Sequence, residues 1–180
     1  MKAAVFLDRD GVLCEDRADY VRSWADWRWV PGALEGAAAI ARAGRPLVVI
    51  TNQACIGKGL VPRAVVDGIH RRMGDDLAAA GAPLAGVYVC PHAPDDGCDC
   101  RKPRPGMLLA AARDLDLDLA ASTFVGDNLR DGEAAAAAGT RFVLTLTGQG
   151  PRWLEEARRR GAPPRTAPDL RAAAELILRG

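Results

Sequence analysis

The feature that most constrains the fold of this chain is a regular alternation between short apolar runs and longer stretches rich in alanine and leucine. The short runs occupy residues 3–7, 47–50, 86–90, 123–125 and 141–146. Continuous runs rich in β-branched residues suit strands buried on both faces, as in a parallel sheet. The longer stretches occupy residues 31–43, 62–80, 106–115 and 130–138. Strand and helix in repeated succession predict an α/β fold built on a doubly wound parallel sheet.

Proline and glycine mark the boundaries of the expected helices. Pro31 and Pro62 stand where two helices would begin, and Gly44, Gly81 and Gly139 stand where helices would end. One or two further helices are expected after residue 151. With 180 residues, 49% of them hydrophobic, the chain can bury one core, so we predict a single domain over residues 1–180.

The charge balance excludes several classes of partner. Lysine and arginine number 24 against 23 aspartates and glutamates, a net charge of +1, which leaves no electrostatic footprint for nucleic acid or an anionic membrane. No apolar run approaches the roughly 20 residues of a transmembrane helix, and Asp8 interrupts the N-terminal run before it could act as a signal sequence. We therefore expect a cytoplasmic protein, and a monomer, because no long amphipathic stripe is left for a partner.

Polar residues stand where the apolar runs end. Asp8 and Asp10 follow the first run, Thr51 follows the second, and Asp127 follows the fourth. The ends of parallel strands lie along one edge of a sheet, where open α/β proteins bind their ligands. Clustered carboxylates repel one another unless a cation lies between them, and oxygen ligands suit Mg²⁺. These residues therefore predict a magnesium site at the sheet edge.

The same cluster is suited to phosphoryl transfer. A carboxylate can attack phosphorus and form an aspartyl-phosphate. A second carboxylate two residues later, in a tight turn, can protonate the leaving oxygen and then activate water. Gly11 permits such a turn and exposes backbone amides to a phosphate. Any one of these aspartates alone would be read as a loop cap, whereas the set favours catalysis.

A second cluster points to zinc. Cys90, His92, Cys98 and Cys100 form two ligand pairs, each spaced by two residues, and three thiolates with one imidazole make a closed tetrahedral site. A closed site leaves no position for water, so we expect a structural zinc whose loop orients the cations that follow Cys100. The alternative is three free cysteines and a surface histidine. The total of five cysteines argues against a disulfide framework.

Residues 14–30 differ from the rest of the chain because Tyr20, Trp24, Trp27 and Trp29 lie among charged residues directly after the first predicted strand. These aromatic side chains would either line a pocket or pack on the body of the protein. His70 stands alone in a helical stretch, and the sequence assigns it no role.

Taken together, these residues resemble the four motifs of the haloacid dehalogenase (HAD) superfamily of phosphatases, in the order of the family and over nearly the whole chain. The motifs are Asp8-x-Asp10-Gly11, Thr51-Asn52, Lys102 before Pro103, and Gly126-Asp127 with Asp131. The resemblance implies that Asp8 is the nucleophile and Asp10 the general acid and base. It implies that Thr51 and Lys102 hold the phosphoryl group.

The same resemblance implies a set of magnesium ligands. These would be Asp8, the backbone carbonyl of Asp10, and Asp127, with Asp131 as a more distant member of the site. It also implies a HAD-like Rossmannoid fold with a minimal cap and a zinc loop at residues 90–100. Residues 14–30 and the zinc loop would wall the pocket in place of a cap domain.

The zinc loop narrows the resemblance. Together with Arg-Lys-Pro-Arg-Pro-Gly-Met at residues 101–107, it is similar to that of the small capless HAD phosphatases that remove the 7-phosphate of D-glycero-D-manno-heptose 1,7-bisphosphate. It is also similar to that of the related histidinol-phosphate phosphatases. The likeness implies substrate contacts from Asn52, Gln53, Lys58 and Arg101, with Arg101 on the phosphate that stays.

The chain departs from the usual family pattern at Val12, Ala54, Cys55 and Asn128. None of these positions carries a catalytic group, so the departures bear on the substrate and its anomer rather than on the reaction class. The alternatives are a histidinol-phosphate phosphatase, another small sugar-phosphate phosphatase, and a zinc-stabilised binding module with a vestigial site.

Two sets of charged residues would distinguish a heptose bisphosphate from histidinol phosphate as the substrate. An amine-bearing substrate favours carboxylates at the mouth of the site, such as Glu15, Asp16 and Asp19. A bisphosphate favours extra cations, such as Lys58 and Arg101.

Overall fold

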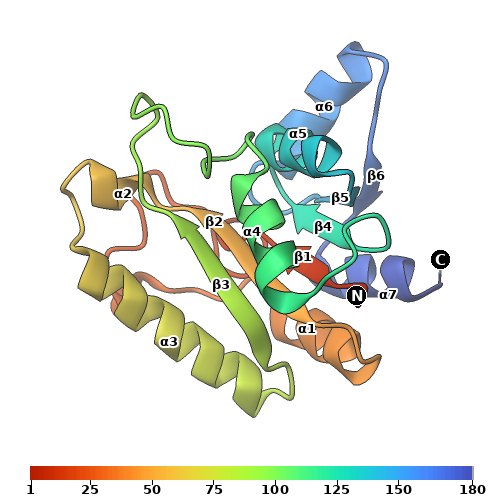
Figure 1. The fold of residues 1–180 in the computed structure, drawn as a ribbon, viewed down its shortest axis with the longest axis horizontal. Helices are drawn as coiled ribbons and strands as arrows, with labels where there is room; N and C mark the ends of the chain where they lie inside the picture. Colours follow the sequence, from red (N-terminus) through yellow and green to blue (C-terminus); the bar gives the residue numbers. More distant parts are fainter. Residues whose placement is uncertain (180) are drawn as a thin grey trace.

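The computed structural model describes residues 1–179, which form one six-stranded sheet flanked by helices (Figure 1). The strands are β1 (Val5–Leu7), β2 (Leu47–Asn52), β3 (Leu84–Cys90), β4 (Thr123–Gly126), β5 (Arg141–Thr145) and β6 (Arg165–Ala167). They lie in the order β3-β2-β1-β4-β5-β6, and every neighbouring pair is parallel. The predicted doubly wound parallel sheet is confirmed.

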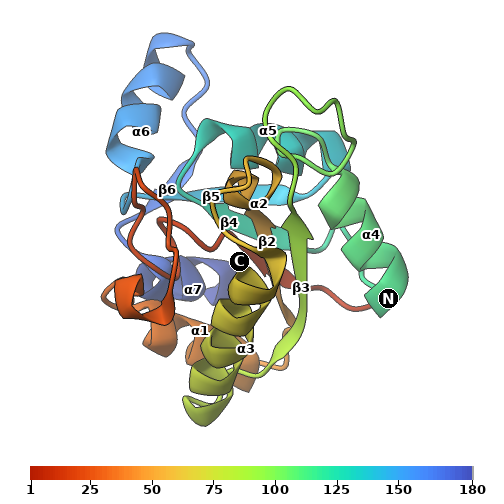
Figure 2. The ribbon, with the colours of Figure 1, turned by 90° about the vertical axis from the view of Figure 1, so that its left-hand side faces the viewer.

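Helices cover both faces of this sheet. They are the 3-10 turn η1 (Trp24–Asp26), α1 (Ala33–Arg42), α2 (Ala54–Gly57), α3 (Arg63–Ala79), α4 (Gly106–Leu115), α5 (Leu129–Ala138), α6 (Gly150–Arg159) and α7 (Leu170–Arg179). Figures 1 and 2 show α1, α3 and α7 on one face and α4 and α5 on the other. Side chains of β1 alternate between the two, since Val5 and Leu7 join the core under α1 and α7 while Phe6 joins the core under α4 and α5. Strand β1 is therefore apolar at every position.

Three details differ from the expectations. Strand β6 was not predicted because its residues Arg-Thr-Ala form no apolar run, and it exists because the chain pairs with β5 in register. The short helix α2 was also not predicted. The run at 86–90 was expected to be buried on both faces, but β3 lies at the edge of the sheet and most of its residues are partly exposed.

The chain order creates a crevice at one edge of the sheet. From β1 the chain builds β2 and β3 on one side and then crosses over to build β4, β5 and β6 on the other. The loops that leave β1 and β4 therefore run in opposite directions along the sheet. Open α/β sheets bind ligands at such a point, where the order of the strands reverses. The expected site residues follow β1, β2 and β4 at this edge.

Both expectations for residues 14–30 hold in part, because the three tryptophans pack on the body of the protein and Tyr20 lines the crevice. Trp24 stacks on Trp27 with ring centroids 5.0 Å apart, and Trp29 meets Trp27 edge-on at 5.1 Å. Trp27 is buried in the core beneath α1, and the partly buried Trp24 and Trp29 pack against this core. The preceding residues Arg17 and Tyr20 reach the crevice. None of the helices within residues 1–179 is long and apolar enough to cross a membrane.

Candidate active site

A cleft of about 180 Å³ opens at the carboxyl edge of the sheet. Its walls are Asp8, Asp10, Asp16, Arg17, Tyr20, Asn52, Arg101, Lys102, Asp127, Asn128, Arg130, Asp131 and Gln149. Three of the four expected catalytic residues, namely Asp8, Asp10 and Lys102, therefore meet in one place although up to 94 positions separate them along the chain. The fourth, Thr51, is fully buried, and its hydroxyl accepts a hydrogen bond from Gln53 Nε2 at 2.8 Å.

Asp8 and Lys102 form the centre of the cleft. The Lys102 ammonium lies 2.8 Å from Asp8 Oδ1 and 2.7 Å from Asp131 Oδ1, and it donates to the carbonyl of Ile50 at 3.0 Å. The backbone N–H of Arg9 also donates to Asp8 Oδ1, at 2.7 Å. All these contacts to Asp8 use Oδ1, which leaves Oδ2 available to a ligand. Lys102 is only 4% exposed, and although burial alone would lower its pKa, the two carboxylates raise it, so the side chain is a fixed cation.

Three carboxylates lie close enough to share a cation. Oxygen atoms of Asp8, Asp127 and Asp131 all lie within 4.8 Å of one another. Burial and the neighbouring Asp131 raise the pKa of Asp127 to about 7, and burial with Asp131 also raises the pKa of Asp8. Because crowding disfavours the ionised forms, a divalent cation with a preference for oxygen ligands fits this set.

The turn after β1 holds Asp127 in place. Gly11 adopts a φ of +84°, and a Cβ atom built on it would lie 2.0 Å from Asp127 Oδ2. A Cβ atom on Gly148 would lie 2.2 Å from the same oxygen. The backbone N–H of Gln149 donates to Asp127 Oδ2 at 2.8 Å. The carboxylate thus sits in a cradle that only glycine leaves open.

Asp10 is engaged at both carboxylate oxygens. Arg9 donates to Oδ1 through Nε at 3.1 Å and through one terminal nitrogen at 2.7 Å, and Gln53 Nε2 donates to Oδ2 at 2.9 Å. Burial would raise the pKa of Asp10, but the Arg9 charge and the hydrogen bonds from Arg9 and Gln53 outweigh it and lower the pKa. The carboxyl is thereby held at the cleft, two residues from Asp8.

The four expected substrate contacts occupy different positions. Asn52 lines the cleft, but its side-chain amide pairs with the backbone N–H and carbonyl of Lys102, both at 3.1 Å. Gln53 is only 1% exposed and lies behind Asp10. Lys58 donates to the Tyr20 hydroxyl at 3.0 Å.

Arg101 is the member of this group that faces the cleft with a cationic side chain, and it donates to the backbone carbonyl of His92 at 3.2 Å. A second cavity of about 340 Å³ adjoins the first, and both are lined by Arg101, Lys102 and Arg130. Arg104 lines the second cavity as well. Arg130 was not predicted from the sequence as a site residue. The feature that could have indicated it is its position in the first turn of α5, directly before Asp131. The two cavities together form a cleft whose outer part is basic.

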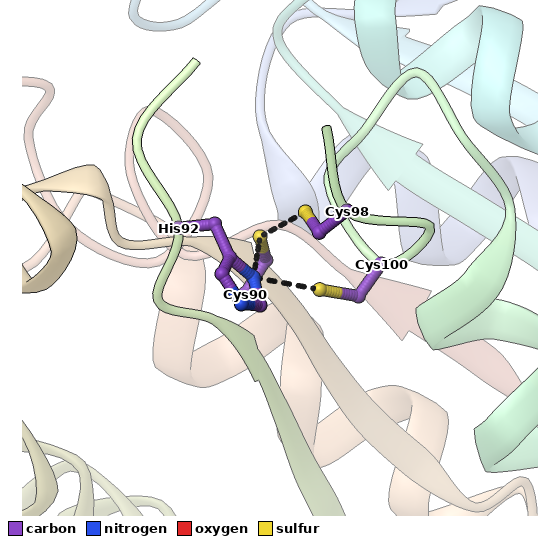
Figure 3. A group of neighbouring side chains, drawn as sticks. All are labelled: Cys90, His92, Cys98 and Cys100. Atoms are coloured by element: carbon purple, nitrogen blue, oxygen red, sulfur yellow. Dashed lines mark hydrogen bonds between the residues drawn. The ribbon is translucent and has the colours of Figure 1, made fainter. Parts of the chain in front are cut away.

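The cysteine and histidine ligands converge as expected (Figure 3). His92 Nδ1 lies 3.6 Å from Cys90 Sγ and 3.3 Å from Cys100 Sγ, and the Cys90 and Cys98 sulfur atoms are 3.6 Å apart. Ligands about 2.3 Å from a tetrahedral zinc would be roughly 3.8 Å apart, so the spacing fits that ion. Burial and the adjacent thiols raise the pKa of Cys100 to about 12, a crowding that a bound cation relieves.

Comparisons with known proteins agree with this geometry. Residues 99–173 match the family described as HAD-hydrolase-like. The chain is 42% identical to the D-glycero-beta-D-manno-heptose-1,7-bisphosphate 7-phosphatase of Bordetella bronchiseptica over 176 residues, covering 97% of both chains. The enzyme of the same name from Pseudomonas putida is 40% identical over 176 residues, covering 97% of this chain and 98% of that one.

The chain belongs to the heptose-1,7-bisphosphate 7-phosphatase family of HAD-like hydrolases.

Solved structures of this family have the same fold. A crystal structure of D,D-heptose 1,7-bisphosphate phosphatase from B. bronchiseptica, in complex with magnesium and phosphate, superposes with a TM-score of 0.92 at 42% identity and covers 99% of both chains. The corresponding structure from Burkholderia thailandensis has a TM-score of 0.76 at 36% identity and covers 99% of this chain and all of that one. The expected HAD-like fold is thus confirmed over almost the full length.

Proposed function

We propose that this protein hydrolyses the 7-phosphate of D-glycero-β-D-manno-heptose 1,7-bisphosphate through an aspartyl-phosphate on Asp8. The observation that carries the proposal is the contact between Lys102 and Asp8 Oδ1 at the floor of a cleft whose outer part is basic. The names of the relatives at about 40% identity supply the substrate and its β-anomer.

The first half of the reaction forms a bond and breaks one. Asp8 Oδ2 attacks phosphorus, and the bond between phosphorus and the C7 oxygen breaks in line with the attack. Asp10 gives its proton to the leaving oxygen. The bound phosphate brings negative charge beside Asp10, which favours the protonated form that this step needs. Lys102 and Thr51 are the residues that we assign to the phosphoryl oxygens.

The second half returns the enzyme to its starting state. Water attacks the phosphorus of the aspartyl-phosphate, and Asp10 takes a proton from that water. The bond between phosphorus and Asp8 Oδ2 breaks, which releases inorganic phosphate and restores Asp8. When bound, Mg²⁺ supplies positive charge for the transferring phosphoryl group. Its ligands would be Asp8, the Asp10 backbone carbonyl and Asp127, with Asp131 beside them.

The charges at the outer cleft favour a bisphosphate over an amine-bearing substrate. Arg101 and Arg130 border both cavities and would pair with the 1-phosphate. Of the carboxylates that an amine would need, Asp16 accepts a hydrogen bond from Gln149 at 2.7 Å and Asp19 pairs with Arg17 at 3.0 Å. The remaining predicted contacts, Asn52, Gln53 and Lys58, support the site through Lys102, Asp10 and Tyr20 respectively.

We further propose that Zn²⁺ occupies the site made by Cys90, His92, Cys98 and Cys100, and that it is structural. The chain would act as one domain and as a monomer. None of the five cysteines, all within residues 1–179, forms a disulfide, which suits a reducing compartment and supports a cytoplasmic location.

The proposal is tested by phosphate release with Mg²⁺ on both anomers of the heptose bisphosphate, with histidinol phosphate and fructose 1,6-bisphosphate as comparison substrates. We expect the highest kcat/KM on the β-anomer and loss of activity on chelation. Asp8→Asn should abolish turnover while leaving the circular dichroism spectrum unchanged, because its amide cannot attack phosphorus.

A preference for histidinol phosphate would overturn the substrate and leave the catalytic residues in place. Normal turnover by Asp8→Asn would overturn the mechanism itself.

A further inference from the structure

The Arg9 side chain is a deeply buried charge next to the cleft. It is only 1% exposed, and two of its nitrogens donate to Asp10 Oδ1. Its other terminal nitrogen lies 3.1 Å from Nε2 of His70, a residue 61 positions later in the chain. The Trp27 ring lies 6.0 Å from the guanidinium carbon. One end of Arg9 therefore holds Asp10, and the other end is held by helix α3.

His70 is placed to accept this hydrogen bond. It is buried on the inner face of α3, where burial and the Arg9 charge lower its pKa to about 4, so the ring is neutral at pH 7. Since the guanidinium has only donors, the hydrogen bond requires that Nε2 carry the lone pair. The proton of the neutral ring then resides on Nδ1. The ring also borders the groove between α3 and β3.

We infer that His70 is a positioning residue for catalysis: through Arg9 it holds the Asp10 carboxyl in the orientation that proton transfer requires. The inference rests on the proposed function, in which Asp10 is the acid and base. The other Asp10 oxygen is held by Gln53, so the carboxyl is fixed from two sides.

The physical reason is the cost of an unpaired buried donor. Without the His70 acceptor, one terminal nitrogen of Arg9 would lie in the interior with no partner there, which costs more than the hydrogen bond is worth. The guanidinium would then shift to find another acceptor, and its two bonds to Asp10 Oδ1 would lengthen or break. Proton transfer depends on the donor lying within hydrogen-bond reach of the leaving oxygen, so it is the step that would suffer.

The experiment compares two substrates that differ in their need for an acid. The heptose bisphosphate releases an alkoxide that must be protonated, whereas 4-nitrophenyl phosphate releases a phenolate that does not. For both, kcat/KM reports on the steps up to the breaking of the phosphate ester bond. We expect His70→Leu to lower kcat/KM about 10-fold or more on the heptose bisphosphate and less than about 2-fold on the aryl ester.

Two further variants separate positioning from stability. His70→Gln offers an acceptor oxygen in place of Nε2 and should restore most of the activity on the heptose substrate. Met73→Ala removes buried volume from the hydrophobic core one turn further along α3, and it should lower kcat/KM for both substrates by the same factor.

Equal losses on both substrates for His70→Leu would overturn the inference, as would failure of His70→Gln to restore activity. If the wild-type protein hydrolyses the aryl ester but not the heptose bisphosphate, the proposed substrate is wrong, and the inference is then decided with any alkyl phosphate that the protein does hydrolyse. If the wild-type protein hydrolyses no phosphate ester, the proposed function falls and the inference falls with it.

Discussion

At the scale of single residues, the cleft is built from charges that compensate one another. Lys102 offsets Asp8 and Asp131, and Arg9 offsets Asp10, so each of these three carboxylates has a cation within 3.1 Å. Buried charges are tolerated only when they are paired in this way. In Asp8 the pairing fixes Oδ1 and leaves Oδ2 available for the chemistry.

The position of Gly11 gives a sharp test of this construction. We expect Gly11→Ala to lower kcat/KM by at least about 100-fold, because the added methyl group would lie 2.0 Å from the Asp127 carboxylate and displace it. The measurement is steady-state kinetics on the heptose bisphosphate, together with urea unfolding.

The matched control is Gly81→Ala. Gly81 has a similar φ of +81°, but nothing lies within 4 Å of the added atom. It should lose about 1 kcal/mol of stability from backbone strain and retain its activity. Activity of Gly11→Ala equal to that of Gly81→Ala would show that the cradle around Asp127 is not needed.

At the scale of elements, the role that we propose for the zinc loop is to fix the positions of two cationic side chains. Arg101 and Lys102 directly follow Cys100, and the Arg101 side chain donates back to the His92 carbonyl. The loop is also held from α2, where the backbone N–H of Gly57 donates to the Pro91 carbonyl at 2.7 Å. Fixing the loop lowers the conformational entropy that these side chains lose when they bind phosphate.

Cys98→Ser should therefore weaken substrate binding as well as zinc binding. We expect the zinc content to fall from one ion per chain to less than about 0.2, and the KM for the heptose bisphosphate to rise about 10-fold, because two cationic side chains lose their preorganisation. Zinc is measured by elemental analysis of the purified protein, and KM by phosphate release.

The control for this variant is Asp99→Ala, which changes a fully exposed side chain between two of the ligands. It should keep both the zinc and the KM. Loss of zinc from Cys98→Ser with no change in KM would separate the ion from substrate binding and contradict the role that we give the loop.

At the scale of the whole molecule, the site exists only because the sheet brings distant segments together. Asp8 follows β1, Lys102 lies in the loop after β3, and Asp127 follows β4. A cation that binds between Asp8 and Asp127 must stabilise the folded state, because the unfolded chain cannot offer both carboxylates at once.

Magnesium should accordingly raise the melting temperature. At a free Mg²⁺ concentration of 100 times its Kd, the stabilisation is about 2.7 kcal/mol, or roughly 5–10 °C in Tm for a chain of this size. Differential scanning calorimetry with and without Mg²⁺ measures the shift, with Asp127→Asn and the exposed Asp75→Asn as a pair. The shift should vanish in the first variant and persist in the second; a shift that persists in both would place the ion elsewhere.

The sequence by itself determined the architecture and the chemistry of the site. Buried strands need continuous apolar runs and helices need their own periodicity, so local patterns were enough to predict five of the six strands, the doubly wound sheet and the meeting of Asp8, Asp10 and Asp127 in one cleft. The zinc ligands could be read in the same way, because a short loop places residues such as Cys98 and Cys100 side by side whatever the rest of the chain does.

The tertiary structure alone decided which side chains touch. Strand β6 depends on a partner rather than on its own residues, and the exposure of β3 depends on its place at the edge of the sheet. The hydrogen bond between His70 and Arg9, which in turn holds Asp10, joins residues 61 positions apart. Arg130 reaches the cleft only because α5 begins at the edge of that cleft. Such contacts arise from the packing of a helix on a sheet, which local composition does not encode.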